Sequence, residues 1–456
     1  MEHIFDKGVT VKNFVKFVWP SVLMMVVIAL YYGFDSVFVA NLVGETALAS
    51  LSIAYPVQGI MWGVAVMLAA GSSAIVAIKM GEGNQKEADE KYTLICAVAL
   101  VIGLIMTALC LIFMDTVIDF LGATAELESY CSEYLGILIW GFPAAFIGVL
   151  FEYFIRVDGN PGFTLFLYIS GGVVHLALDY VLMGPLDMGL KGAAYANVAG
   201  LVTVMLAGGA YFIFADTKLK FVNFIFRETR LSFRKFTVDW KYIGHCFLNG
   251  SSEMVSESSA GIATFFFNLM AIRFAGETGV AAVSIVLNIF YFLTSVHLGY
   301  ITGVSPLISY YYGAREYDKV NVFIRYSRWF TLVTSAASAV VCLVFAKYIV
   351  MLFERPGSEL FDLALTGTRF LAIAVLFCGV NIFASGFFTA YGNGIISAAI
   401  SMSRGLVMVI TGIFLLGWLL EMTGIWLVPA FADAVTLVLS FVMFARYKGV
   451  YNYRII

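Results

Sequence analysis

The chain of 456 residues has a formal net charge of −3; 61% of its residues are hydrophobic and 12% are charged. Soluble proteins carry about 25% charged residues, so this chain has too few charges to cover a water-exposed surface. The composition excludes a soluble or disordered protein, and it indicates a protein that crosses the membrane many times.

The first 16 residues are mixed and polar, and they precede an apolar run longer than that of a signal peptide. No small-residue cleavage site follows this run, so we expect an uncleaved first span. The six cysteines show neither C-x-x-C nor metal-ligand spacing, and we expect buried free thiols. They are Cys96, Cys110, Cys131, Cys246, Cys342 and Cys378.

A helix needs about 20 predominantly apolar residues to cross the hydrocarbon core. By this measure the sequence predicts twelve spans, near residues 13–41, 47–78, 92–114, 130–153, 163–184, 190–214, 243–272, 279–311, 323–350, 364–390, 395–419 and 424–445. The apolar runs are continuous and lack the alternation of barrel strands, which excludes a β-barrel. The expected fold class is an all-α polytopic membrane protein.

One long connection, residues 215–242, divides the twelve spans into two sets of six. We therefore expect an N-terminal lobe (1–214), a linker (215–242) and a C-terminal lobe (243–456). The linker is basic, with Lys218, Lys220, Arg227, Arg230, Arg234, Lys235 and Lys241.

The distribution of lysine and arginine predicts the orientation of the chain in the membrane. If the N-terminus is inside, 22 of the 27 basic residues fall on the cytoplasmic side, Arg404 among them. Cytoplasmic loops of membrane proteins are enriched in such residues, so we expect both termini and the linker in the cytoplasm of a plasma-membrane protein. The loop 115–129, with four acids and no base, is expected outside.

The two halves are related in sequence. With a constant offset of 232, residues 44–81 align without gaps to residues 276–313, and ten of the 38 positions are identical. An even number of crossings separates equivalent spans, so the repeats are parallel and the lobes are related by a pseudo-twofold axis along the membrane normal. In transporters built this way the substrate site lies between the halves, near the midplane.

Ionisable side chains within spans are costly, so each is a functional candidate. In the first half, Asp35 follows Tyr31 and Tyr32 in span 1, and Asp179 lies in the middle of span 5. His175 precedes Asp179 by four residues, which puts both on one helix face. We expect Asp35, Asp179, His175 and, from span 6, Asn197 to bind the coupling ion, and Tyr32 to contact the substrate.

In the second half, Glu253 and Glu257 are four residues apart on span 7, amid five serines. Two ionised carboxylates at this spacing repel, so one should be protonated or face water. We expect both to bind substrate, together with Asn381 in span 10. Asp433 in span 12 is a further candidate. In the first half, Glu152 and Arg156 form an i, i+4 pair that we interpret as structural.

The chemistry of the spans favours cations. We find no arginine or lysine at the middle of any span, which an anionic substrate would require, and aromatic residues and methionines can add cation–π and soft apolar contacts. Signatures of metalloproteases, nucleotide-binding loops and dinucleotide-binding folds are missing, and the four histidines are dispersed. We expect no enzyme activity, no metal and no nucleic-acid partner, so any pumping must draw on an ion gradient.

Several segments together resemble the multidrug and toxic compound extrusion (MATE) transporters. DSVFVANLVGETALA at 35–49 resembles the family's span 1–2 signature, and GSSA at 71–74 with KMG at 79–81 resembles its span 2–3 region. GETGVAA at 276–282 through SYYYG at 309–313 resembles the second-half copy. The Gly-Asn pairs at 159–160 and 392–393 match in both halves. The resemblance covers essentially the whole chain.

The resemblance implies a V-shaped pair of six-helix lobes that exports small organic cations in exchange for H+ or Na+. It places the family's span-1 acid at Asp35, its bending proline, a hinge, at Pro20, its span-5 acid at Asp179 and its span-7 acid at Glu253. His175 stands where the family usually has asparagine, and span 10 has only an asparagine where sodium-linked members carry an acid. These departures favour protons over sodium.

Two alternatives stay open at this point. A flippase for lipid-linked sugars or peptidoglycan precursors belongs to the same superfamily, but it tends to hold basic residues in its cavity. An intramembrane enzyme would need a nucleophile–base pair or a metal cluster, and the sequence shows neither. We expect a monomer in the lipid bilayer, with no cofactor apart from the coupling ion.

Overall fold

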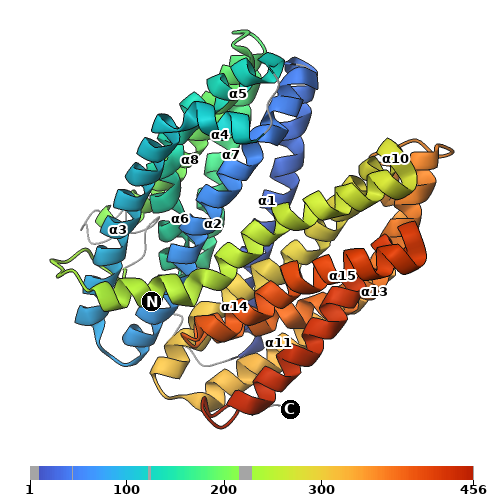
Figure 1. Ribbon diagram of the computed structural model, residues 1–456. Helices are drawn as coiled ribbons and strands as arrows, with labels where there is room; N and C mark the ends of the chain where they lie inside the picture. Colours follow the sequence, from blue (N-terminus) through green and yellow to red (C-terminus); the bar gives the residue numbers. More distant parts are fainter. Residues whose placement is uncertain (1–9, 44, 122–124, 215–228, 455–456) are drawn as a thin grey trace.

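The computed structural model describes residues 10–43, 45–121, 125–214 and 229–454, and these residues form helices without a β-strand (Figure 1). The elements are α1 (Val11–Leu42), α2 (Glu45–Gly81), α3 (Gln85–Ile112), α4 (Met114–Phe120), α5 (Ala125–Leu138), η1 (Ile139–Gly141), α6 (Phe142–Val157), α7 (Pro161–Met183), α8 (Gly189–Phe214), α10 (Trp240–Gly313), α11 (Tyr317–Val344), α12 (Ala346–Val350), α13 (Glu359–Ala390), α14 (Gly394–Met402), η2 (Ser403–Val407) and α15 (Met408–Tyr447).

Among the residues that the structure describes, ten helical stretches are long and apolar enough to cross a membrane, and two of them double back. Helix α10 has 74 residues, about 110 Å at 1.5 Å per residue, far more than one crossing needs. It reverses at Ala275 and Gly276, where the backbone is non-helical. The stretch from α14 through α15 reverses at Glu421. Counting two legs for each of these stretches gives twelve crossings, so the predicted all-α architecture is confirmed.

Short Gly-Asn motifs join several helices at one end of the molecule. Gly83, Gly159 and Gly392 have φ values of 78°, 93° and 77°, a left-handed conformation that favours glycine after a helix. The asparagine that follows each glycine caps the next helix, as Asn160 does by accepting a hydrogen bond from the Phe163 backbone N–H. An asparagine side chain replaces the missing carbonyl partner at a helix N-terminus. The Gly-Asn pairs therefore build tight helix–helix turns.

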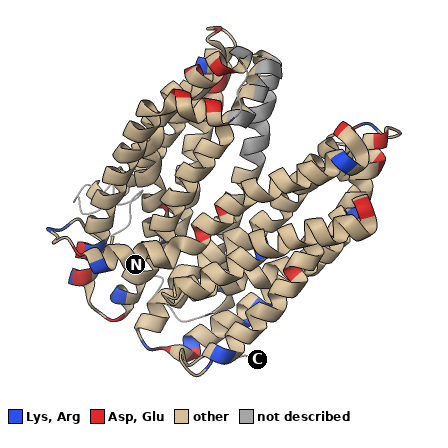
Figure 2. Ribbon diagram, in the orientation of Figure 1, with Lys and Arg blue, Asp and Glu red and all other residues tan. Residues whose placement is uncertain are grey.

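The helices form two lobes that converge at one end and diverge at the other (Figure 1). Both ends of the described chain lie at the convergent end. Residues 229–239 lie there too, and we call this segment the strap. Charged residues gather at helix ends and loops, and most of the length of the helices is free of them (Figure 2). One apolar core fills the N-terminal lobe, and two further cores fill the C-terminal lobe.

Candidate functional site

A buried acid–imidazole pair lies in the N-terminal lobe, on α7. His175 Nε2 is 3.2 Å from Asp179 Oδ2, and both residues are buried, at 3% and 0% exposure. The predicted placement on one helix face is confirmed. Asp179 is 18 residues from Pro161, about 27 Å along the helix at 1.5 Å per residue, and four residues from the end at Met183. The expected mid-span position of Asp179 is therefore corrected: it lies in the divergent half of the lobe.

Close helix packing holds this pair in place. A Cβ on Gly200 of α8 would lie 3.1 Å from both the Gly171 carbonyl oxygen and the His175 Cβ, so small residues let α8 approach the face of α7 that carries His175. Asn197 lies on the same helix α8 and is partly buried. Helix α1 packs against α7 as well. The side chains of Asp35 and Tyr32 lie outside the described residues, while Pro20 lies within the uninterrupted helix α1.

The acids of α10 lie between the lobes. Glu257 faces α2, because a Cβ added to Gly63 would sit 3.4 Å from the Glu257 Cβ. Glu257 is exposed and Glu253 partly buried. Both carboxylates lie within electrostatic range of the Tyr153 hydroxyl on α6. Glu253 is 13 residues from Trp240, about 20 Å along the helix. The two acids therefore lie where α10 meets α2 and α6 of the N-terminal lobe, well away from the start of α10 at Trp240.

A second buried polar network lies within the C-terminal lobe and includes Asn381. Asn381 is fully buried and donates to the Asp433 backbone oxygen (2.8 Å) and to its Oδ1 (3.0 Å). Arg404 Nε donates to the same Oδ1 at 2.9 Å, and Ser440 Oγ donates to Asn381 Oδ1 at 2.9 Å. Asn381 is thus engaged inside the lobe, on α13, with partners from η2 and α15.

Arg404 contradicts the expectation that no span carries a base near its middle. It lies in the π-helical segment η2, ten residues and about 15 Å from the start of α14, so it is also not a loop base on the cytoplasmic side. Its pairing with buried Asp433 lets the charge stay at this depth, because a buried ion needs a partner. The predicted orientation does not depend on Arg404, because 21 of the other 26 basic residues still fall on the side expected to be cytoplasmic.

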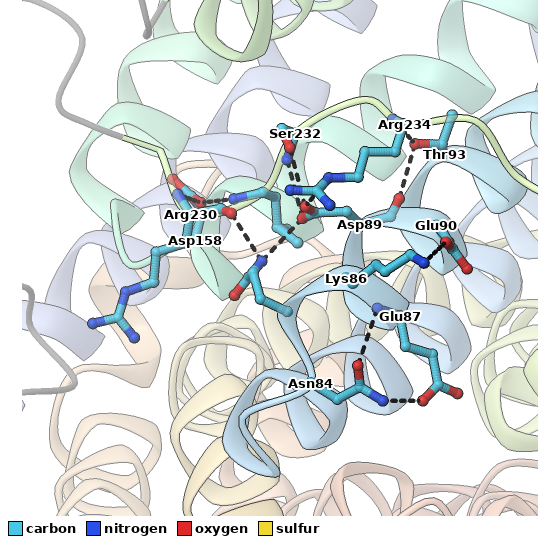
Figure 3. A network of polar contacts seen from close by, with 12 residues as sticks. Asn84, Lys86, Glu87, Asp89, Glu90, Thr93, Asp158, Arg230, Ser232 and Arg234 are labelled. Atoms are coloured by element: carbon cyan, nitrogen blue, oxygen red, sulfur yellow. Dashed lines mark hydrogen bonds and ion pairs between the residues drawn. The ribbon is translucent and has the colours of Figure 1, made fainter.

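The strap docks on the N-terminal lobe through two buried aspartates that no sequence pattern singles out (Figure 3). Asp158 Oδ1 accepts hydrogen bonds from the Arg230 and Leu231 backbone N–H groups (2.7 and 2.9 Å), and its Oδ2 accepts one from Tyr211 (2.7 Å). Asp89 pairs with Arg234 Nε at 2.9 Å. Burial raises the pKa of Asp158 to about 7, against these hydrogen bonds, which lower it. The sequence signal for this contact is weak: the linker is basic, and Asp89 and Asp158 lie outside the predicted spans.

Three other features of the described residues bear on the sequence expectations. The predicted Glu152–Arg156 pair is confirmed, with Arg156 Nη2 2.7 Å from Glu152 Oε1. All six cysteines are free, five of them buried and Cys110 partly so. Asn249, which no sequence pattern marks as a candidate, is fully buried and donates to the carbonyl oxygens of Gly71 and Thr389 at 3.1 Å each. It joins the two lobes through a polar contact.

Comparison with known proteins agrees with this architecture. The family model described as MatE matches residues 20–181 and 254–414, two segments related by nearly the same offset as the internal repeat. The chain is 22% identical over 424 residues, 92% of its own length and 90% of the relative's, to the multidrug export protein MepA of Staphylococcus haemolyticus. The MepA protein of Staphylococcus aureus strain MSSA476 is 20% identical over 427 residues, which cover 93% of this chain and 91% of that protein.

Solved structures share the fold over nearly the full chain. An outward-facing conformation of a multidrug resistance MATE family transporter superposes with a TM-score of 0.89 at 22% identity, covering 99% of this chain and 97% of that one. A transporter of the MOP superfamily from Pyrococcus furiosus, described as having a binding pocket of reverse polarity, gives a TM-score of 0.88 at 22% identity with the same coverage. Since the family model matches both halves, the chain belongs to the MatE family of membrane transporters.

Proposed function

We propose that this protein exports small organic cations and drugs from the cytoplasm in exchange for protons. The proposal that transport is coupled to protons rests on the buried pair of His175 and Asp179, whose side chains are 3.2 Å apart. An ionised carboxylate in an apolar lobe needs a compensating charge, and a proton on the pair supplies it. An imidazole nitrogen can accept and release a proton, whereas a sodium ion prefers several oxygen ligands.

The acids of α10 support a cationic substrate. Glu253 and Glu257 lie on α10 beside α2 and α6 of the N-terminal lobe, where a substrate held between the lobes would contact both. Carboxylates at this place attract organic cations, and aromatic side chains such as Tyr153 add cation–π contacts. The name of the similar MepA proteins, multidrug export protein, supports the export of drugs.

The open end of the V gives the direction of transport under this proposal. The lobes diverge at the end opposite the strap (Figure 1). With the strap and termini in the cytoplasm, as the distribution of basic residues predicts, the divergent end faces outward. The described state is then outward-open. Binding of a proton at the α7 pair would let α1 bend at Pro20, where the helix lacks a backbone N–H, and expel the substrate.

The function is tested with purified protein in liposomes loaded with a fluorescent organic cation. The proposal expects an imposed pH gradient to drive cation movement and a sodium gradient at fixed pH to drive little. A flippase would instead move a lipid-linked substrate and leave the dye in place. The ion pair between Arg404 and Asp433 counts against that alternative, because this guanidinium already has a carboxylate partner.

A further inference from the structure

The closed end of the V is built from glycine contacts that the internal repeat duplicates. A Cβ on Gly81 of α2 would lie 2.0 Å from the Tyr310 carbonyl oxygen, and a Cβ on Gly313 of α10 would lie 2.1 Å from the Ile78 carbonyl oxygen. Real Cβ atoms essentially never come closer than 3.0 Å. The two glycines are equivalent at the offset of 232, and so are Ile78 and Tyr310. Each repeat therefore presents its glycine to the equivalent carbonyl of the other.

A second layer of close contacts between a glycine and a backbone carbonyl oxygen lies further from the ends of α2 and α10 at Gly81 and Gly313. A Cβ on Gly71 of α2 would lie 2.1 Å from the Cys246 carbonyl oxygen, and a Cβ on Gly250 of α10 would lie 1.8 Å from the Met67 carbonyl oxygen. At the repeat-related place, Gly299 and Gly303 of α10 lie against α1, with the Ser21 carbonyl oxygen 2.7 Å from a Cβ on Gly299. The first helix of each half thus crosses the second helix of the other half.

The starts of α1 and α10 also pack into the apolar core of the opposite lobe. Four residues at the start of α1 belong to a core of the C-terminal lobe: Phe14, Phe17, Val18 and Val22. Three residues at the start of α10 belong to the core of the N-terminal lobe: Tyr242, Ile243 and Cys246. Asn249 adds its hydrogen bond to the Gly71 carbonyl oxygen, and Arg230 of the strap donates to the Tyr310 hydroxyl at 3.4 Å. Separating the lobes at this end would break all of these contacts together.

We propose that the repeat-related backbone contacts of Gly81 and Gly313 are the latch of a cytoplasmic gate, whose closure requires that neither position carry a side chain. The proposal rests on the proposed function for its orientation and for the need to open this end. A methyl group at either position would push α2 and α10 apart, because backbone atoms cannot move aside as a flexible side chain can. The equilibrium between the closed and open gate would shift toward the open form.

Cys246 is a native reporter of this gate, since it is fully buried and its backbone contacts Gly71. The experiment starts from the full chain with the other five cysteines replaced by alanine. This background and its Gly81→Ala and Gly313→Ala variants are treated in inside-out membrane vesicles with a membrane-impermeant maleimide. We expect labelling of Cys246 to rise about tenfold in each glycine variant, the population change that follows from one overpacked methyl group. The Gly244→Ala variant is the matched control, because no described heavy atom lies within 4 Å of a Cβ there.

A second background separates gate opening from general loosening. It retains only Cys378, which is fully buried inside the C-terminal lobe, away from the gate. Its labelling should not change in the glycine variants. The proposal is overturned if Cys246 stays unreactive in both variants, if Gly244→Ala unmasks it equally, or if Cys378 is unmasked in parallel. Labelling needs neither substrate nor coupling ion, so the two proposals can fail separately. If the wild-type protein exports no cation but Cys246 is unmasked in the glycine variants, the proposed function is refuted and the gate proposal stands.

Discussion

Replacement of Arg404 by methionine tests the buried network of the C-terminal lobe. In the wild-type protein, the Asp433 carboxylate receives the Arg404 guanidinium at 2.9 Å and the Asn381 amide at 3.0 Å, and Asp433 is 2% exposed. The variant keeps the amide and loses the only positive partner that the described contacts of Asp433 show. Removing one member of a buried pair costs about 3–5 kcal/mol, because the other charge stays behind uncompensated. We expect a loss of that size in the free energy of unfolding.

The companion variants make the test quantitative. The double variant Arg404→Met with Asp433→Asn removes both charges and keeps a hydrogen-bonding group opposite Asn381, so it should recover most of the lost stability. Unfolding of each variant is followed in detergent by intrinsic fluorescence under matched conditions. A cost below about 1 kcal/mol for Arg404→Met, the value of an exposed ion pair, would refute the inference that this pair is a buried, mutually dependent unit. So would a double variant that is no more stable than Arg404→Met.

Three further predictions address topology, substrate and the strap. A reporter fused after residue 456 should be cytoplasmic and a tag within 115–129 external; an external C-terminus by protease protection would contradict the span count. Glu253→Gln should slow liposome transport of cationic dyes more than of neutral ones, because it removes negative charge between the lobes, and equal losses would indicate a structural role. Burial raises the pKa of Asp158 above its unfolded value, so the folded state binds more protons between about pH 4 and 7, and stability falls as pH rises through that range. Asp158→Asn should therefore gain melting temperature relative to wild type as pH rises from 5 to 8, and a pH-independent difference would contradict this.

The helical framework could be predicted because each span carries its own signal. Apolar runs of about 20 residues and the basic linker indicate the number of crossings, and the alignment of residues 44–81 with 276–313 predicts the lobe symmetry. The reversals at Gly276 and Glu421 occur within single assigned helices, so no long polar loop separates the legs. The breaks between the predicted spans, 272–279 and 419–424, nevertheless contain both reversals, because Arg273, Glu277 and Glu421 interrupt the apolar runs there.

Local spacing predicts the contacts within single helices and misses those between helices. The pairs His175–Asp179 and Glu152–Arg156 are i, i+4 neighbours, and a helix brings such residues together whatever surrounds it. Arg404 and Asp433 are 29 residues apart, and their pairing depends on how η2 packs against α15. Sequence distance hides such a contact, and the expectation that Arg404 is a cytoplasmic loop base is wrong for that reason.

The docking of the strap follows the same logic. Asp158 is 72 residues from Arg230, and the bonds it accepts come from backbone N–H groups, which every residue except proline has. Sequence composition marks 215–242 as basic but cannot tell which part of it packs. Asn249 is equally hard to find from sequence, because its partners are the backbone carbonyl oxygens of Gly71 and Thr389.

The most direct test of the central claim is cation transport by Asp179→Asn and Asp35→Asn in liposomes under an imposed pH gradient. We expect each variant to insert and to bind cationic dye, and each to lose pH-driven transport, because an amide cannot take up and release the coupling proton. Wild-type protein should respond to the pH gradient and hardly to a sodium gradient at fixed pH. Full pH-driven activity in either variant, or strong sodium-driven transport without a response to pH, would contradict the account.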